Sequence, residues 1–197
     1  MLPVRPTVST AACHAALREA GVAYQSVSSA AGGVIAQPIV LLGPVGGVQV
    51  RGAGKIDAVT SHLDCRLALT LLAWAPLLRS RNVVGLEHYS MYRAEAVVGS
   101  SARASGHASG LAVDVAVIEL GDGRKLSVLH DWANRARGGD PCGSWPDHDA
   151  GKLLRELVCD AAARGLFQTI VTPHHNDAHA NHVHLEITPE RNAPWIR

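Results

Sequence analysis

The chain has 197 residues, a length that fits one domain, and its 47% hydrophobic and 18% charged residues exclude a disordered chain and a coiled coil. Eighteen basic residues against 17 acidic ones give a net charge of +1, which argues against nucleic-acid or anionic-membrane partners, because both bind proteins with a basic excess. Only 4% of the residues are aromatic, so we expect a core of Ala, Val and Leu.

The N-terminal part of the chain predicts a tail, one helix and short strands. We expect an extended tail over residues 1–10 and a helix over 11–20 that ends at Gly21. Residues 26–33 are rich in Ser, Ala and Gly and predict a loop. Residues 34–50 are rich in Val and Ile but interrupted by Pro and Gly, which is typical of short strands with turns.

The remainder predicts two long helices and several strands. An apolar stripe predicts a helix over 61–78, and a second helix is expected over 150–164, ending at Gly165. Further elements are expected in this order: a strand over 83–89, irregular structure over 98–109, a strand over 111–120, a turn at 121–123, a strand over 125–129, a short helix from Asp131, a loop over 137–149, and strands over 167–171 and 182–187. This mixed order favours an α+β fold, a small antiparallel sheet flanked by helices, in one domain over 11–197 that divides into 11–60 and 61–197.

Four widely separated cysteines, Cys13, Cys65, Cys142 and Cys159, contain no CxxC pair, which argues against zinc-ribbon and thioredoxin-type motifs. An even count fits two disulfides and therefore an oxidising compartment such as a periplasm. Four reduced, buried thiols are the alternative. Of the three pairings, we favour Cys13–Cys65 and Cys142–Cys159, because each joins segments that a compact fold could bring together.

Neither a targeting nor a membrane-spanning segment is expected in this chain. Residues 1–6 lack the basic start and apolar run of a signal peptide. The longest apolar stretch, Leu67–Leu78, is interrupted by Pro76 and is too short to span a bilayer. We therefore expect a soluble monomer.

One acidic residue, Asp114, lies among the valines of the strand expected over 111–120. Alternation places it on one face with the small residues Ala112 and Ala116, while His107 lies in the loop that enters the strand. A buried carboxylate is costly unless its charge is neutralised. A bound cation would neutralise it, and the small neighbours leave room for one. A buried ion pair with Lys or Arg is the alternative.

Five of the 11 histidines lie between His174 and His184. In a strand, His182 and His184 point to the same side. Two imidazoles together with an Asp and another His supply the N and O ligands that Zn²⁺ prefers, and a catalytic zinc needs three protein ligands with a fourth position open for water. The metal ligands would be His107, Asp114 and His184, which leaves His179 and His182 free to act on the water.

These motifs resemble a known group of enzymes. The residues that carry the resemblance are Ser105-x-His107-x-x-Gly110-x-Ala112-x-Asp114 and the later His182-x-His184. They resemble the LAS group of zinc peptidases, which includes D-Ala-D-Ala peptidases and murein endopeptidases. More specifically, most of residues 13–187 are similar to the extensin-like C-terminal domain of bacterial proteins. The chain departs from that family at Tyr92, where a cysteine usually stands, and at Gly106, where an acidic residue usually precedes the first histidine.

The resemblance implies a LAS-type α+β fold, an extracytoplasmic and for example periplasmic location, and peptidoglycan peptides as substrates. It also implies one Zn²⁺ per chain, held by His107, Asp114 and His184. Zinc would lower the pKa of its bound water from about 15.7 toward roughly 7. His182 and His179 would accept the proton and pass it to the leaving amine.

Four further residues are candidates around this site. Arg93 or Arg103 would bind a substrate carboxylate, or else each is a solvated surface charge. Ser105 would form a hydrogen bond near the site or serve only to shape the loop. Asp177 would orient His179 or a metal ligand, or else it is a plain turn residue.

The function expected from these residues is zinc-dependent hydrolysis of peptide bonds in peptidoglycan. The alternative is a non-catalytic, zinc-containing module that binds the cell wall or another protein, since an intact metal site does not guarantee turnover. A third alternative is a metal-storing protein that uses the histidines between His174 and His184, and it predicts several metal ions per chain.

Overall fold

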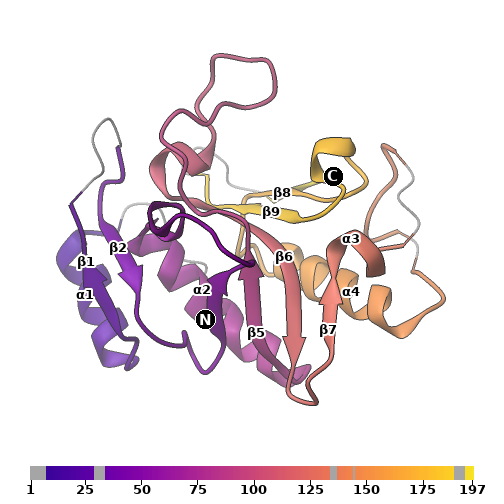
Figure 1. The fold of residues 1–197 in the computed structure, drawn as a ribbon, viewed down its shortest axis with the longest axis horizontal. Coiled ribbons are helices and arrows are strands. Elements are labelled where there is room, and N and C mark those ends of the chain that lie inside the picture. Colours follow the sequence, from indigo (N-terminus) through magenta and orange to yellow (C-terminus); the bar gives the residue numbers. More distant parts are fainter. Residues whose placement is uncertain (1–7, 29–33, 134–136, 144, 189–193) are drawn as a thin grey trace.

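The computed structural model describes residues 8–28, 34–133, 137–143, 145–188 and 194–197 (Figure 1). It has a mixed α+β architecture with two sheets. The helices are α1 (Thr10–Glu19), α2 (Cys65–Ser80), α3 (Val128–Asp131) and α4 (Asp149–Ala163), and the 3-10 turns are η1 (Ala58–Ser61), η2 (Gly106–Ser109) and η3 (Asp177–His179). Among the described residues, none of these helices has the length and hydropathy needed to cross a bilayer.

The large sheet has seven strands in the order β10-β8-β9-β6-β5-β3, with β7 paired to β6. Their bounds are β3 (Gln49–Gly52), β5 (Val83–His88), β6 (Ala112–Leu120), β7 (Lys125–Ser127), β8 (Thr169–Val171), β9 (Val183–Glu186) and β10 (Trp195–Ile196). The small sheet is antiparallel, in the order β1 (Tyr24–Ser26), β2 (Pro38–Leu41) and β4 (Leu63–Asp64).

The expectation of one small antiparallel sheet is wrong in two respects. A second sheet exists, and the large sheet is mixed, because β3–β5 and β10–β8 are parallel pairs. The chain leaves β3, passes through η1, β4 and helix α2, and only then enters β5. A crossover of this length returns the chain in the same direction, whereas a tight hairpin would reverse it.

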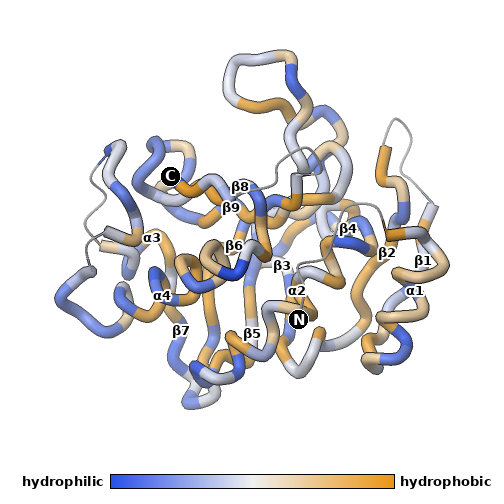
Figure 2. The backbone as a smooth tube through the Cα atoms, turned by 180° about the vertical axis from the view of Figure 1, so that it is seen from behind, coloured by the Kyte–Doolittle hydropathy of each residue, from blue (hydrophilic) through white to orange (hydrophobic). Residues whose placement is uncertain are grey.

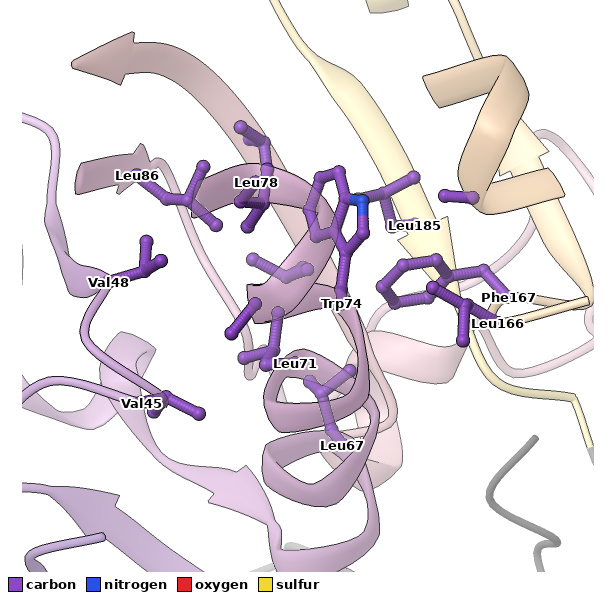
Figure 3. Close-up of a cluster of buried hydrophobic side chains, with 14 of the residues drawn as sticks. Val45, Val48, Leu67, Leu71, Trp74, Leu78, Leu86, Leu166, Phe167 and Leu185 are labelled. Atoms are coloured by element: carbon purple, nitrogen blue, oxygen red, sulfur yellow. The ribbon is translucent and has the colours of Figure 1, made fainter. Parts of the chain in front are cut away.

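Helix α2 forms the centre of the core. Figure 3 shows its side chains Leu67, Leu71 and Trp74 among residues from β5, β9 and the segment before β8. Trp74 packs edge-on against Phe167, with ring centroids 5.5 Å apart. The hydrophobic residues follow the central strands and α2, while the turn between β6 and β7 is hydrophilic (Figure 2). The core is built mainly from aliphatic side chains, as the composition predicts.

Several element boundaries differ from the expectation for local reasons. Helix α2 begins at Cys65 instead of residue 61, because the Asp64 carboxylate accepts the Arg66 N–H as an N-cap. The strand expected over 125–129 ends at Ser127, whose N–H donates to the Asp131 carboxylate, so the short helix ends at Asp131 instead of beginning there. Strands β1, β4 and β10 were not predicted. Of the tail expected over 1–10, residues 1–7 lie outside the described residues, as do residues 29–33 of the expected loop.

Both predicted disulfides are confirmed, and the alternative of reduced thiols is wrong. Cys13–Cys65 joins α1 to the first residue of α2. Cys142–Cys159 joins the loop after α3 to α4. The described cysteines therefore leave no free thiol.

Candidate metal centre

Three side chains from separate elements converge on one point. His107 comes from η2, Asp114 from β6 and His184 from β9. Antiparallel pairing sets Asp114 directly opposite His184. The His107 Nε2 atom lies 2.9 Å from Asp114 Oδ1 and 3.0 Å from His184 Nδ1, and the last two atoms are 3.0 Å apart. All three residues are buried.

Local structure brings His107 into this triangle. Ser105 caps η2 by accepting the His107 N–H, which is the loop-shaping role considered for this serine, and Ser105 also lines the neighbouring cavity. Gly110 ends the turn with φ of +66°, a conformation that disfavours side chains. A Cβ at this position would also lie 2.8 Å from the Asp64 backbone nitrogen. This tight turn lets η2 lead directly into β6.

The protonation of the two imidazoles tests whether the triangle suits a cation. His107 Nδ1 lies 3.2 Å from the Met91 carbonyl, so it carries a proton and leaves a lone pair on Nε2. Likewise, His184 Nε2 lies 3.0 Å from Glu186 Oε2, so it donates and turns Nδ1 toward Asp114. The three atoms that face one another are His107 Nε2, His184 Nδ1 and Asp114 Oδ1, and at most one proton is left to bridge their three contacts. A single Zn²⁺ about 2.0–2.2 Å from each atom would satisfy all three. The residues therefore fit a metal ion.

The electrostatics of the triangle also favour a positive charge. The pKa of His184 is raised to about 9: burial lowers it, but the carboxylates of Asp114 and Glu186 outweigh burial. Burial would raise the pKa of Asp114, but the close contacts with the imidazoles of His107 and His184 hold it well below its usual range. Burial lowers the pKa of His107, against the opposing effect of Asp114. Without a metal ion, the protonated imidazole of His184 would supply the positive charge beside the Asp114 carboxylate.

The second carboxylate oxygen of Asp114 has its own partners. The Ser90 hydroxyl donates to Oδ2 over 3.2 Å, and the Arg93 guanidinium donates to the same atom over 3.1 Å. The ion pair considered as an alternative for Asp114 therefore exists, but on Oδ2, while Oδ1 faces the histidines. The two interpretations are compatible, since each uses a different oxygen.

Two further histidines lie beside the triangle. His182 Nε2 is 3.5 Å from Asp114 Oδ1, and the rings of His182 and His179 are 5.0 Å apart. The Nδ1 atoms donate to neighbouring amides, over 2.8 Å from His182 to Asn181 and over 2.6 Å from His179 to Asn176. This leaves the lone pair on Nε2 of each ring. Burial lowers the pKa of His182 and lowers that of His179 to about 4, so both are neutral near pH 7.

A cavity of about 710 Å³ opens over these residues, a size typical of ligand sites. One wall is the segment between β5 and η2, which projects from the body of the protein in Figure 1 and contributes Arg93 and Arg103. The opposite wall includes Val171 and Trp195. Within the described part of the chain, Arg93 is held by Asp114, whereas no ion pair engages Arg103. Both arginines thus line the cavity, and their role in binding a substrate carboxylate stays a prediction.

The structure does not place Asp177 where a ligand-orienting residue would lie. Its side chain is 98% exposed and pairs with Arg137, while the neighbouring Asn176 holds His179. The turn interpretation of Asp177 is therefore the one that the structure supports. Sequence reasoning missed Glu186, whose carboxylate contacts His184. The signal was available, because residues two apart in a strand share a face.

A family model described as "Extensin-like protein C-terminus" matches residues 11–196. The matched range includes the three residues of the triangle, both neighbouring histidines and both disulfides. Comparison with curated proteins and comparison with solved structures each gave no match.

Proposed function

This chain belongs to the extensin-like protein C-terminus family, and we propose that it is a zinc-dependent peptidase acting on the stem or cross-link peptides of bacterial peptidoglycan. The observation that carries the proposal is the triangle of His107, Asp114 and His184, in which three donor atoms 2.9–3.0 Å apart share at most one proton. The resemblance of the same motifs to LAS-type peptidases supports peptide hydrolysis. The two disulfides support an extracytoplasmic, for example periplasmic, location.

When bound, Zn²⁺ would supply two things: a water molecule that deprotonates near neutral pH, and a positive charge that polarises the scissile carbonyl. The residues around it then supply acid–base chemistry. His182 accepts the proton of the attacking water at Nε2, because Asn181 holds the other ring nitrogen as a donor. His182 then returns the proton to the leaving amine. The ring centroid of His179 lies 5.0 Å from that of His182, so His179 is the second imidazole that can accept this proton.

Digestion of purified peptidoglycan tests the proposal. We expect mass spectrometry to detect muropeptide fragments with zinc-loaded protein and none after treatment with a chelator, with recovery on adding Zn²⁺. Binding to sacculi without fragment release would instead identify a non-catalytic module. Binding of several metal ions per chain would favour a storage protein, although only one group of potential ligands was found among the described residues.

Metal binding should release at least one proton per ion at pH 7.5, because His184, with its pKa raised to about 9, must lose a proton to coordinate, and the zinc-bound water loses part of a second proton. The affinity for Zn²⁺ should therefore rise by at least about tenfold per pH unit from pH 7 to pH 9, and less steeply above that range. Calorimetric titration in buffers of different ionisation enthalpy measures the proton directly. Binding without proton release at pH 7.5 would contradict the assignment of His184 as a ligand.

Replacing Arg103 by Ala should raise KM for a carboxylate-bearing peptide by roughly 10–100-fold with little change in kcat, because a hydrogen bond to a charged group contributes about 1.5–3 kcal/mol. Arg93 is the less suitable candidate, since Asp114 already engages it. Steady-state kinetics on muropeptides with free and amidated carboxylates measures the effect. Arg124→Ala is a matched control, because Arg124 pairs with Asp122 on the turn between β6 and β7. An equal KM for both variants would rule out Arg103 as the carboxylate-binding residue.

A further inference from the structure

Glu186 is a largely buried carboxylate that lies beside the metal triangle and lines the same cavity. Its side chain is 12% exposed, and Oε2 lies 3.0 Å from His184 Nε2, on the side of the ring away from Asp114. Because His184 and Glu186 are two residues apart in β9, both side chains emerge on the same face of the sheet. We infer that Glu186 is a positioning residue that orients His184 for metal binding, an inference that rests on the proposed metal site.

Two further groups hold the Glu186 carboxylate in place. The Gly106 N–H donates to Oε2 over 3.0 Å, and the Thr188 hydroxyl donates to Oε1 over 3.0 Å. With the bond from His184, both oxygens are engaged. The pKa of Glu186 is lowered accordingly: burial would raise it, but the hydrogen bond and the charge of His184, together with the hydrogen bonds from Gly106 and Thr188, outweigh burial. A carboxylate held at both oxygens fixes the direction in which the His184 ring faces.

The contact between the Glu186 carboxylate and His184 Nε2 determines which ring nitrogen of His184 carries the proton. A carboxylate that accepts the Nε2 proton selects the tautomer with a free Nδ1 and makes this nitrogen a stronger donor to a metal. Without the carboxylate, the His184 ring can rotate or carry its proton on Nδ1. Glu186 does not touch the cation position itself, so it acts through His184.

The residue at position 106 must be small for this arrangement to exist. A Cβ on Gly106 would lie 2.6 Å from Cγ and Cδ of Glu186 and 2.7 Å from Oε2. The backbone of Gly106 begins an ordinary 3-10 turn and needs no positive φ. An alanine here would therefore act by displacing the Glu186 carboxylate and not by straining the chain. The inference thus links two residues that are 80 positions apart in the sequence.

Zinc affinity, measured by competition with a chromophoric chelator, tests the inference. We expect Glu186→Ala to weaken Zn²⁺ binding about 10–100-fold, and Glu186→Gln to weaken it less, since the amide oxygen can still accept the His184 proton. The absorption bands of the Co²⁺-loaded protein should change in Glu186→Ala, because the ligand field depends on how His184 faces the ion. Glu87→Gln is the control: Glu87 pairs with Arg51 and Lys125, and zinc affinity should stay unchanged.

A double-substitution cycle separates positioning from a general structural effect. Gly106→Ala in the wild-type background should weaken zinc binding by a similar factor. The same substitution in the Glu186→Ala background should add almost nothing, because the atoms that an added Cβ would meet are gone. Gly106→Ala changes no side chain of β9, so the inference stays testable even if Glu186→Ala fails to fold.

The outcomes distinguish the inference from the proposed function. If the wild type binds no Zn²⁺, the metal site itself is overturned. If the wild type binds Zn²⁺ and either Glu186→Ala or Gly106→Ala binds it equally well, the positioning role is overturned while the metal site stands. Weakening in both single variants without further loss in the double variant supports the role of Glu186.

Discussion

Replacing His184 by Ala should reduce bound zinc from one ion per chain to almost none and abolish peptide hydrolysis. The substitution removes one of three donor atoms and leaves only two protein ligands, fewer than the three that a catalytic zinc needs. It also leaves the carboxylates of Asp114 and Glu186 without the imidazole that both contact. Elemental analysis after gel filtration in low-zinc buffer, together with fragment release from peptidoglycan, measures both effects.

His130 provides a matched control for this experiment, because it is an exposed histidine on the short helix α3. His130→Ala should keep full zinc content and activity. Circular dichroism of both variants shows whether the fold is intact. A folded His184→Ala protein with unchanged zinc content would refute the proposed ligand set.

Replacing His182 by Gln should separate the two effects: the protein should keep its zinc but lose most of its activity. His182 is the proposed proton acceptor, and its Nε2 atom lies 3.5 Å from Asp114 Oδ1. Removing a general base lowers kcat by about 10²–10⁴-fold. Zinc affinity should change only a few-fold. Steady-state kinetics combined with chelator competition gives both quantities.

The pH profile provides a second readout for His182. Since burial lowers the pKa of this imidazole, it is neutral across the neutral range and becomes protonated only on acidification. The acidic limb of kcat against pH should therefore change in His182→Gln. His179→Gln should lower kcat less, because His182 Nε2 lies 3.5 Å from Asp114, whereas the ring centroid of His179 lies 6.3 Å from that of His184. A His182→Gln enzyme with normal kcat would show that another group accepts the proton.

Local sequence patterns predicted much of the site. An aspartate among valines, with small residues on its own face, indicated Asp114, and the two-residue spacing of His182 and His184 indicated a shared face. Structure places these groups together, with Asp114 opposite His184 in the β6–β9 pair. Periodicity also predicted α1, α2 and α4 to within a few residues, because apolar stripes and capping residues act within one or two turns.

Other features depended on contacts between distant segments. The parallel pairing at both ends of the large sheet follows from the crossover through α2 and from the return of β10 to β8, neither of which has a local signature. The outward direction of Asp177 depends on its partner Arg137, 40 residues earlier. Nothing near Asn176 in the sequence distinguishes it from Asp177 as the partner of His179.

By itself, the sequence determined the chemical types at the centre and most helices, because each depends on residue identity or on spacing within one element. It favoured the two disulfide pairs, but each pair joins different elements and so depends on how these elements pack. Only the tertiary structure decided which groups support the metal ligands. Glu186 lies against both His184 and Gly106, and Arg93 lies against the outer oxygen of Asp114. These contacts join η2, β6, β9 and the segment after β5, so they arise from how the elements pack and not from any pattern within one of them.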